Sequence, residues 1–398
     1  MALAYDYYHH VGVRNMKHIG ILVPSFPVAS ETFVVTEINA LVASGHQVTV
    51  VTFENIGECD ALSPEVTVIE VEKPSRAELL LGVFNIPRLV RGISSATKMK
   101  SIATSSLVAY RYSIANIIKH RRIDHLHCHF MHGSLAYGIV GAKLAHITVS
   151  SIGHGHDVYV NQSDIPQKLS LCDFSVAVCQ DMANQFSRYT HSKVKLLHCG
   201  INLERFNQAP TGAYNDVKLL FIGRLVEKKG LHFLMPALKN TLLTHQITLD
   251  IVGDGTLMND LKFMVEALGI TNNVNFLGRK PPTWIADNTK NYSALVAPFC
   301  IAKNGDRDTG PLVLKEAMGS GIAVLTTELM GAKEIVNQKV GMKCKPSDIM
   351  DLTRMLSQFC DFSPYQRFTM GQNGKRFVTK HFNAKAQAEK LSGWVQAL

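Results

Sequence analysis

Short apolar runs alternate along this chain with segments whose apolar residues recur at helical spacing. Seven runs in the first half have the length and β-branched content of strands: residues 18–23, 47–53, 66–71, 124–130, 147–152, 173–178 and 193–198. Residues 32–45, after the first run, have a helical pattern, and Gly45 is its expected C-terminal cap. This alternation predicts a parallel sheet wrapped by helices.

The pattern stops in a polar stretch with proline and glycine, residues 201–216, and then restarts. Five further strands are predicted at residues 217–223, 248–253, 274–278, 292–299 and 322–327, again separated by helical segments. Residues 364–398 are helical in pattern, and no strand follows them. Since 398 residues exceed the size at which one core keeps growing, we predict two doubly wound α/β domains with a boundary near residues 203–216.

The predicted domain limits follow from these patterns. They are an N-terminal extension at 1–15, a first Rossmann-like domain at 16–205, a second at 206–375, and a C-terminal helix at 376–398 that crosses back to the first domain. The extension is expected because the sequence from Met16 onward looks like a natural start. Ligands of doubly wound sheets bind at the carboxyl ends of the strands, so two such domains facing each other predict an interdomain cleft.

The composition is that of an ordinary globular protein, with 46% hydrophobic and 18% charged residues. The eight cysteines are scattered without a CxxC pair, which favours buried thiols in a reducing cytosol over a disulfide framework or a zinc site. No apolar run approaches the roughly 18 residues that span a bilayer, and the N-terminus lacks a signal peptide's apolar core. We therefore expect a cytoplasmic protein, neither secreted nor integral to a membrane.

Much of the net charge of +9 lies in residues 75–122, which carry nine basic residues and one acid. Apolar residues within 106–122 recur at helical spacing, so a helix with basic ends is predicted there. Two interpretations of this segment stay open. It binds anionic lipid headgroups at the inner face of the cytoplasmic membrane, or it is an ordinary solvated helix face.

Candidate chemistry begins where the strand at 217–223 ends. Arg224 and Lys229 fall at the carboxyl edge of the sheet, where a guanidinium can bind phosphate oxygens through two hydrogen bonds and an ammonium adds a point charge. The alternative interpretation is that both residues are ordinary loop cations that bind no ligand. Gly253 ends the next strand in a Gly-Asp-Gly turn, but Met258 stands where a GxGxxG motif needs its third glycine. This second segment is therefore interpreted as a tight strand-to-helix turn beside a ligand.

The stretch GDRDTGPLVLKE, residues 305–316, places two acids around a predicted helix start. Pro311 suits the first helical position, so a helix is predicted at 311–320 with its free N–H groups and positive dipole end beside Gly310. Asp308 lies just before this helix, and Glu316 lies roughly 7.5 Å along it. Two hydroxyl-accepting carboxylates with a phosphate-binding helix start between them match a nucleotide sugar. A helix cap at Asp308 and a solvated Glu316 are the alternative for this stretch alone.

Histidines cluster around the strand at 124–130. His127 and His129 lie on the same side of it and could form a metal pair, but no third ligand is evident from the sequence. Together with His132 and His156 they are interpreted as core or cleft-lining imidazoles, and no metal site is predicted.

Taken in order, FIGRLVEKKG, IVGDGT, NVNFLGR and DTGPLVLKEAMGSGIAVLTT resemble glycosyltransferase family 4, especially its exopolysaccharide branch of the colanic acid type. In the first half, FPVASETFVVTEINALVASGHQVTVVT, HLHCHF and HGHDVY are similar to the same branch. The resemblance covers nearly all of the chain from residue 16 onward. It implies the GT-B architecture, a first domain that binds the acceptor, a second that binds the nucleotide-sugar donor, and retention of the anomeric configuration.

The resemblance also implies roles for single residues. Arg224 and Lys229 match the diphosphate-binding pair, and Glu316 matches the ribose-binding acid. Asp308 matches the first acid of the E-x7-E motif, which contacts the donor sugar. The backbone N–H groups of Gly310, Pro311 and Leu312 match the remaining donors of the family's phosphate site. His154 matches the histidine near the transferred sugar, and Glu31 and Thr32 match the SETF turn that faces the cleft.

One departure from the family concerns the first acid of that motif. The usual residue is Glu, and here it is Asp308, one methylene shorter. Asp306 is therefore an alternative for the sugar contact, although the register favours Asp308. Residues 306–308 also have the Asp-x-Asp spelling of metal-binding transferases, but their position before the helix favours the E-x7-E interpretation.

These observations predict a mechanism. Departure of the nucleoside diphosphate leaves negative charge that Arg224, Lys229 and the helix start would neutralise, so we predict metal-independent transfer without a cofactor. The donor would be a UDP- or GDP-linked hexose, and the acceptor a glycan or lipid-linked oligosaccharide in cell-surface polysaccharide biosynthesis. No covalent nucleophile stands out, which favours front-face transfer with His154 stabilising the sugar.

Two other functions fit parts of the sequence. A nucleotide-sugar epimerase or hydrolase of the same fold would convert the donor without an acceptor. A non-catalytic membrane or nucleic-acid binder would use residues 75–122 and would keep its function when Lys229 and Glu316 are replaced. Nucleic acid is not an expected partner, because few aromatic residues accompany the basic ones in that segment.

Overall fold

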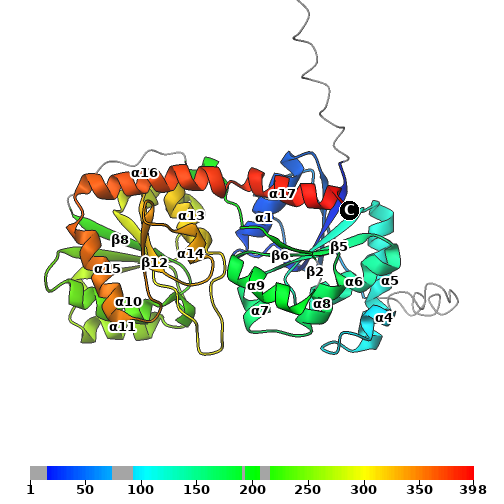
Figure 1. The fold of residues 1–398 in the computed structure, drawn as a ribbon, viewed down its shortest axis with the longest axis horizontal. Helices are drawn as coiled ribbons and strands as arrows, with labels where there is room; N and C mark the ends of the chain where they lie inside the picture. The colour runs from blue at the N-terminus through cyan, green and yellow to red at the C-terminus, as the bar shows by residue number, and fades with distance from the viewer. Residues whose placement is uncertain (1–15, 74–92, 191–192, 207–215) are drawn as a thin grey trace, which may run out of the picture. The chain divides into compact units, whose positions relative to one another are not determined.

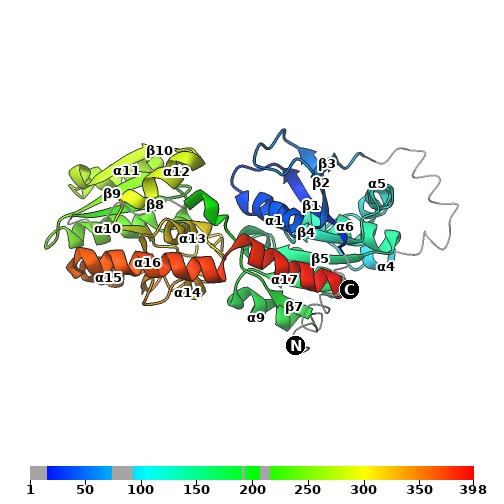
Figure 2. The same cartoon turned by 90° about the horizontal axis from the view of Figure 1, so that it is seen from above.

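A computed structural model shows two β-sheets with helices on both sides of each (Figure 1, Figure 2). It describes residues 16–73, 93–190, 193–206 and 216–398. The predicted extension at 1–15 lies outside the described residues, as does the part of the basic segment at 74–92.

The first sheet has seven strands in the order β3-β2-β1-β4-β5-β6-β7. Their bounds are β1 (His18–Phe26), β2 (Gln47–Asn55), β3 (Thr67–Glu70), β4 (His125–His129), β5 (Thr148–Gly153), β6 (Phe174–Ala177) and β7 (Lys193–Leu196). The pairs β1–β2, β1–β4, β2–β3 and β6–β7 are parallel. All seven strands predicted from the first half are confirmed. The inner strands are buried on both faces, as apolar runs of this length are when helices cover a sheet, whereas the edge strands β3 and β7 are partly exposed.

The second sheet has six strands, all parallel, in the order β10-β9-β8-β11-β12-β13. Their bounds are β8 (Val217–Ile222), β9 (Ile247–Val252), β10 (Val274–Gly278), β11 (Ala294–Ala297), β12 (Ala323–Thr327) and β13 (Gly341–Cys344). The five predicted strands are confirmed. The sequence did not indicate β13, an edge strand of only four residues with a half-exposed middle.

The helices alternate with these strands. Their bounds are α1 (Thr32–Ala43), α4 (Ile93–Ala96), α5 (Thr104–Arg121), α6 (Gly133–Ala145), α7 (Gly155–Tyr159), α8 (Ile165–Leu171), α9 (Gln180–Tyr189), α10 (Leu231–Thr241), α11 (Met258–Ala267), α12 (Pro282–Asn288), α13 (Leu312–Gly319), α14 (Ala332–Ile335), α15 (Ile349–Asp361), α16 (Pro364–His381) and α17 (Ala384–Gln396). The 3₁₀ turns are η1 (Leu203–Phe206), η2 (Glu227–Lys229), η3 (Thr271–Asn273) and η4 (Thr289–Asn291). The C-cap of α1 is Ser44 rather than the predicted Gly45, which follows it in the left-handed region (φ +94°), where glycine commonly ends a helix.

Each sheet has one point at which the strand order reverses. In the first sheet β1 and β4 are neighbours there, and in the second β8 and β11 are. Ligands of open parallel sheets bind beyond the carboxyl ends of the strands at such a point. The loops after β8 and β11 contain Arg224, Lys229 and Asp308, so topology brings together residues separated by about 80 positions in the sequence.

By their internal packing, the residues fall into two compact units, each described here by itself. Among the described residues, unit 1 comprises those within 16–129, 133–150 and 388–398, and unit 2 comprises those within 130–132 and 151–387. The second sheet lies wholly within unit 2, where α10 and α15 bury Leu234, Leu238, Leu352 and Phe359 in its core. The predicted domain limits and the predicted interdomain cleft stay predictions.

The basic helix predicted within 106–122 corresponds to α5, whose last turn carries Lys119 and Arg121. Its Arg111 is fully buried, so that charge cannot face a lipid or solvent surface. Among the described residues, no helix is both long and apolar enough to cross a bilayer.

Candidate active site

The loop after β8 turns sharply at two glycines. Gly223 follows the strand with φ +157°, and Gly230 ends η2 with φ +74°. A Cβ on Gly230 would lie 1.8 Å from the carbonyl oxygen of Pro298, so only glycine allows this close approach to the end of β11. Between them, Arg224 is exposed and Lys229 is largely buried against the ring of Phe299, 5.0 Å from its centroid.

Two neighbouring lysines of this loop pair with two different acids. The Nζ atom of Lys229 lies 3.2 Å from Oδ2 of Asp308, and Nζ of Lys228 lies 3.1 Å from Oδ2 of Asp306. Lys228 also donates a hydrogen bond to Asp306 Oδ1 at 3.1 Å. Asp306 is therefore held by its own lysine, which favours Asp308 as the acid available to a ligand.

Asp308 is the acid whose hydrogen-bonding capacity is not used. Its Oδ2 atom is buried and accepts no aligned hydrogen bond within the described part of the chain, although Lys229 is close. A buried carboxylate oxygen in this state can accept a hydroxyl group of a ligand, and Lys229 has donors left for a second anion.

The helix start predicted beside Gly310 is present, but its first residue differs from the prediction. Pro311 is the N-cap, with φ −62° and ψ 114°, and α13 begins at Leu312. Pro311 has no N–H group, so it cannot serve as one of the backbone donors that the family resemblance implied. The donors at this end are Gly310, Leu312 and the following residues of the first turn, whose N–H groups have no partner within the helix.

Glu316 lies within α13, and its carboxylate accepts no hydrogen bond recorded among the described residues. Burial raises the pKa of this carboxyl, and the positive charges of Arg205 and Lys315 oppose the shift. A half-buried carboxylate with both oxygens available suits the two hydroxyls of a ribose.

The preceding residue, Lys315, has a different role. It is fully buried, donates to the carbonyl oxygen of Cys199 at 2.6 Å, and lies over the ring of Phe382 at 4.9 Å. Burial lowers the pKa of Lys315 to about 8. It therefore fixes α13 to the segment after β7 rather than binding a ligand.

Gly253 joins the loop after β9 to the loop after β8. It has φ +140°, and a Cβ there would lie 1.9 Å from the carbonyl oxygen of Gly223. Further along, Leu225 donates to Asp254 O at 2.9 Å and Leu257 donates to Leu225 O at 3.0 Å. Gly253 thus permits the packing of the loop that carries Arg224.

His154 is the N-cap of α7 in the HGHD turn. The buried carboxylate of Asp157 accepts from His154 N at 3.0 Å and from Met131 N at 2.7 Å, which fixes the turn. A Cβ on Gly155 would lie 2.4 Å from Arg307 O, so within unit 2 this turn abuts the loop that contains Asp308. The sequence did not indicate the role of Asp157.

Glu31 and Thr32 belong to unit 1. Glu31 is the N-cap of α1, and Thr32 is its exposed first residue. The other predicted site residues all belong to unit 2, and the two groups are not placed relative to each other. Their predicted position facing a cleft stays a prediction.

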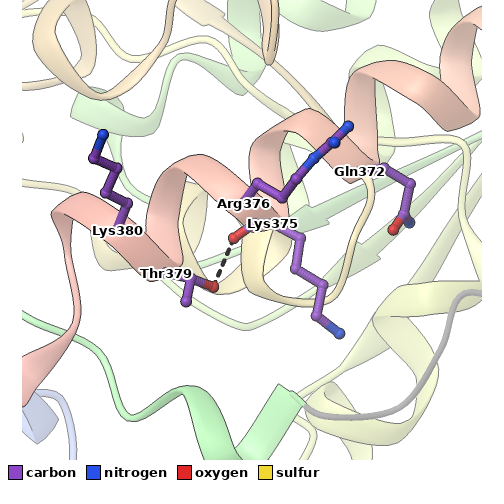
Figure 3. A pocket seen from close by; sticks show the side chains of 5 residues that line it. All are labelled: Gln372, Lys375, Arg376, Thr379 and Lys380. Carbon is purple, nitrogen blue, oxygen red and sulfur yellow. Dashed lines mark hydrogen bonds between the residues drawn. The ribbon is translucent and has the colours of Figure 1, made fainter.

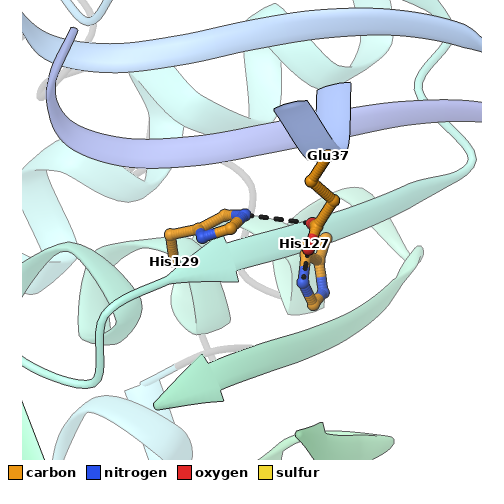
Figure 4. Close-up of side chains that lie close together, drawn as sticks. All are labelled: Glu37, His127 and His129. Carbon is orange, nitrogen blue, oxygen red and sulfur yellow. Dashed lines mark hydrogen bonds and ion pairs between the residues drawn. The ribbon is translucent and has the colours of Figure 1, made fainter. Parts of the chain in front are cut away.

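The histidine cluster has a third potential metal ligand that sequence reasoning missed. His127 and His129 are fully buried on β4, and both approach the carboxylate of Glu37 on α1 (Figure 4). Nothing in the sequence indicated that a residue 90 positions away would join them. His156 is exposed, which excludes a core position and leaves its cleft-lining position a prediction, whereas His132 is partly buried and stacks on Phe130.

A separate surface depression lies along α16 (Figure 3). Its lining consists of Gln372, Lys375, Arg376, Thr379 and Lys380. None of the predicted site residues is among them, and Lys375 already donates to Phe206 O at 3.2 Å.

Two parallel α/β sheets, with cations, a helix start and carboxylates gathered at the switch point of the second, are the features of a GT-B glycosyltransferase. Residues 30–205 match the family model of glycosyltransferase family 4, and residues 204–393 match the model of glycosyl transferases group 1. The chain belongs to glycosyltransferase family 4.

The relatives and solved structures agree with this assignment. The chain is 22% identical to WcaL of Escherichia coli (strain K12), a glycosyltransferase provisionally assigned to colanic acid biosynthesis, over 96% of this chain and 100% of WcaL. It is 22% identical to the amylovoran biosynthesis glycosyltransferase AmsK of Erwinia amylovora, over 79% of this chain and 83% of AmsK.

Among solved structures, Anabaena Alr3699/HepE in complex with UDP has a TM-score of 0.73 at 17% identity, covering 96% of this chain and 100% of that one. Sucrose-phosphate synthase from Thermosynechococcus elongatus has a TM-score of 0.71 at 17% identity, covering 96% and 98%. At these identities the likeness is one of fold.

Proposed function

We propose that this chain is a retaining glycosyltransferase that moves a hexose from a nucleotide-diphosphate sugar to a glycan or lipid-linked acceptor in cell-surface polysaccharide biosynthesis. The observation that carries the proposal is the pair of Lys229 and Asp308, 3.2 Å apart, directly before α13. In this pair, the ammonium of Lys229 would bind the phosphate that leaves, and the carboxylate of Asp308 would accept a hydroxyl group of the transferred sugar.

The proposed donor occupies the site from α13 outward. Glu316 accepts the ribose hydroxyls, while the N–H groups at the start of α13 and the side chains of Arg224 and Lys229 bind the diphosphate. Asp308 accepts a hydroxyl of the sugar. Lys229 has three N–H donors, so one ammonium can contact Asp308 and a phosphate oxygen together.

The relatives guide the choice of substrates. AmsK is named for amylovoran biosynthesis, which supports a polysaccharide or its lipid-linked precursor as the class of acceptor. Alr3699/HepE was solved with UDP and with UDP-glucose, which makes UDP-sugars the first donors to test and GDP-sugars the second.

The decisive experiment separates transfer from the other reactions of such a donor. Thermal shift with UDP, GDP and their sugars identifies the nucleotide, and NMR of the product then gives its anomeric configuration. We expect transfer with retention, dependent on an acceptor. Inversion would overturn the retaining mechanism, and conversion of the donor without any acceptor would favour the epimerase or hydrolase.

The proposed chemistry is front-face transfer, in which the leaving phosphate helps to deprotonate the acceptor hydroxyl and His154 stabilises the sugar. His154→Ala should lower turnover by about 10²–10³-fold while nucleotide affinity persists, because the imidazole acts on the sugar rather than the nucleotide. His156→Ala, a change of an exposed neighbour, is the matched control. Wild-type turnover of the His154 variant would refute this role.

We also propose that transfer needs no metal at the diphosphate. Lys229, Arg224 and the helix start supply the positive charge that a metal would otherwise provide. Activity should persist in EDTA, and activity abolished by EDTA and restored only by Mn²⁺ would contradict the proposal.

Finally, we propose peripheral association with the inner face of the cytoplasmic membrane through residues 75–122. Within the described part, Lys98, Lys100, Lys119, Arg121 and Arg122 are exposed. Pelleting with anionic liposomes should be strong at low salt and lost at high salt, because exposed cations bind anionic headgroups through screened charge interactions. Absence of binding at low salt would exclude it.

A further inference from the structure

Three side chains of unit 1 converge with the spacing of metal ligands. Nε2 of His129 lies 3.1 Å from Oε1 of Glu37, Nε2 of His127 lies 3.6 Å from the same oxygen, and the three ligand atoms all lie within 4.8 Å of one another. Zinc bonds of about 2.0–2.2 Å at tetrahedral angles put ligand atoms about 3.4 Å apart. The two measured separations bracket that value. We propose that Glu37, His127 and His129 bind one divalent transition-metal ion of the zinc type.

A second observation points to a ligand between these side chains. His127 is fully buried, and its Nε2 has no hydrogen-bond partner among the described residues. This nitrogen faces the Glu37 carboxylate at a distance beyond a hydrogen bond (Figure 4). A buried ring nitrogen is normally partnered, and an ion between nitrogen and carboxylate would supply the partner.

A chain of hydrogen bonds holds the His127 ring in one orientation, as is usual for histidines that bind a metal. Its Nδ1 atom is 2.7 Å from Ser150 Oγ, which is 2.7 Å from His125 Nε2, and His125 Nδ1 is 2.7 Å from Thr148 Oγ1. Such an outer hydrogen bond orients a ligating imidazole.

Glu37 supplies the third ligand atom of the group, a carboxylate oxygen beside the two imidazole nitrogens. The Glu37 side chain is 15% exposed, which leaves an entry path for the ion and a fourth position for water. Two His and one Glu with an open position is a ligand set known from zinc enzymes.

The position in the fold adds support. His129 ends β4, and Glu37 lies on α1, the helix that follows β1. β1 and β4 are neighbours at the switch point of the first sheet, where parallel sheets bind ligands. The ion would also tie α1, which begins at the SETF turn, to the sheet. The alternative is a metal-free ion pair between His129 and Glu37.

The test uses the full-length protein stripped with chelator and titrated with Co²⁺ and then Zn²⁺. We expect one ion per chain by elemental analysis, visible d–d absorption from bound Co²⁺, and its displacement by Zn²⁺. Glu37→Gln should weaken metal affinity by more than about 100-fold, since it removes a ligand, and Ser150→Ala by about 10–100-fold, since it removes an outer hydrogen bond.

Controls separate this site from surface histidines and from misfolding. His245→Asn removes another His–carboxylate pair, with Asp361 at 3.0 Å, and should leave metal binding unchanged. Far-UV circular dichroism verifies each fold, and Ser150→Ala keeps the test decisive if Glu37→Gln does not fold. Substoichiometric uptake by wild type, or equal uptake by folded Glu37→Gln and wild type, would overturn the site in favour of the ion pair. Neither outcome depends on glycosyl transfer.

Discussion

At the scale of single residues, Lys228 and Lys229 show how neighbours in sequence acquire different roles. Lys228 is paired with Asp306 through both carboxylate oxygens, whereas Lys229 faces the buried Oδ2 of Asp308. The two pairs run side by side from the same two loops. The first holds the loops together, and in the proposed function the second presents charge to the donor.

Replacing each lysine should therefore have a different consequence. Lys229→Ala should lower turnover by about 10²–10³-fold and weaken nucleotide-sugar binding, because a cation at the leaving phosphate is lost. Lys228→Ala should instead lower the free energy of unfolding by about 1.5–3 kcal/mol, the usual range for a hydrogen bond to a charged group. Steady-state kinetics and chemical unfolding distinguish the two, and equal kinetic losses would contradict the division.

Glu316 gives a prediction on pH. Burial raises the pKa of its carboxyl above the usual 4.5, so folding favours the protonated form. Its contribution to stability is present below the unfolded-state pKa and is lost as the pH rises through the folded-state pKa. In the proposed function, ligand binding should have the opposite dependence, because the ionised carboxylate is the better acceptor for ribose hydroxyls.

We therefore expect affinity for the nucleotide sugar to fall about tenfold as pH drops through a midpoint above 4.5, the cost of one charge-assisted hydrogen bond. Calorimetry with a UDP-sugar measures this, since its diphosphate diester keeps its charge over that range. Glu316→Gln should bind more weakly at neutral pH and lack this pH step. A variant profile parallel to that of wild type would assign the titration to another group.

At the scale of elements, the loops after β8 and β9 pack closely against each other because Gly253, at their contact, has no Cβ atom. Gly253 combines φ +140° with a position 1.9 Å from Gly223 O for any added Cβ. Gly269 has φ +66° but no atom within 4 Å of such a Cβ. An alanine at residue 269 would therefore suffer only the strain of a left-handed backbone. An alanine at residue 253 would suffer a steric clash as well.

Gly269→Ala should cost about 1–2 kcal/mol of unfolding free energy, the usual penalty of a left-handed alanine. Gly253→Ala should cost about 2–4 kcal/mol, because overpacking against a backbone oxygen is added to backbone strain. It should also reduce donor affinity by displacing the loop of Arg224. Chemical unfolding and nucleotide titration of both variants test this, and equal costs would contradict the steric account.

At the scale of the whole molecule, the end of the chain packs with its beginning in unit 1. Ser392 Oγ is 2.7 Å from Nε2 of the buried His46, and Leu391 and Val395 on α17 are fully buried. Leu391→Ala should lower the unfolding free energy by about 2–5 kcal/mol, the range for a leucine cavity in a core. Lys390→Ala, at an exposed neighbouring position, should leave stability unchanged. Equal unfolding midpoints for the two variants would show that α17 is not part of this core.

The sequence by itself determined the strands, because a buried parallel strand needs a continuous apolar run and such runs are visible without neighbours. It missed β13, whose four residues Gly341–Cys344 contain Gly341 and Lys343 and no β-branched residue, so that no apolar run marks this edge strand. Local chemistry also placed a helix start at Pro311, one residue before the observed first residue of α13, Leu312.

Only the tertiary structure decided which distant side chains meet. The pairing of Lys228 with Asp306 and of Lys229 with Asp308 depends on β8 and β11 being neighbours, and the approach of Glu37 to His127 and His129 depends on β1 lying beside β4. Strand order arises from the global packing of the chain, and no local propensity encodes it. The residues and their chemical types were therefore visible in the sequence, while their partners were not.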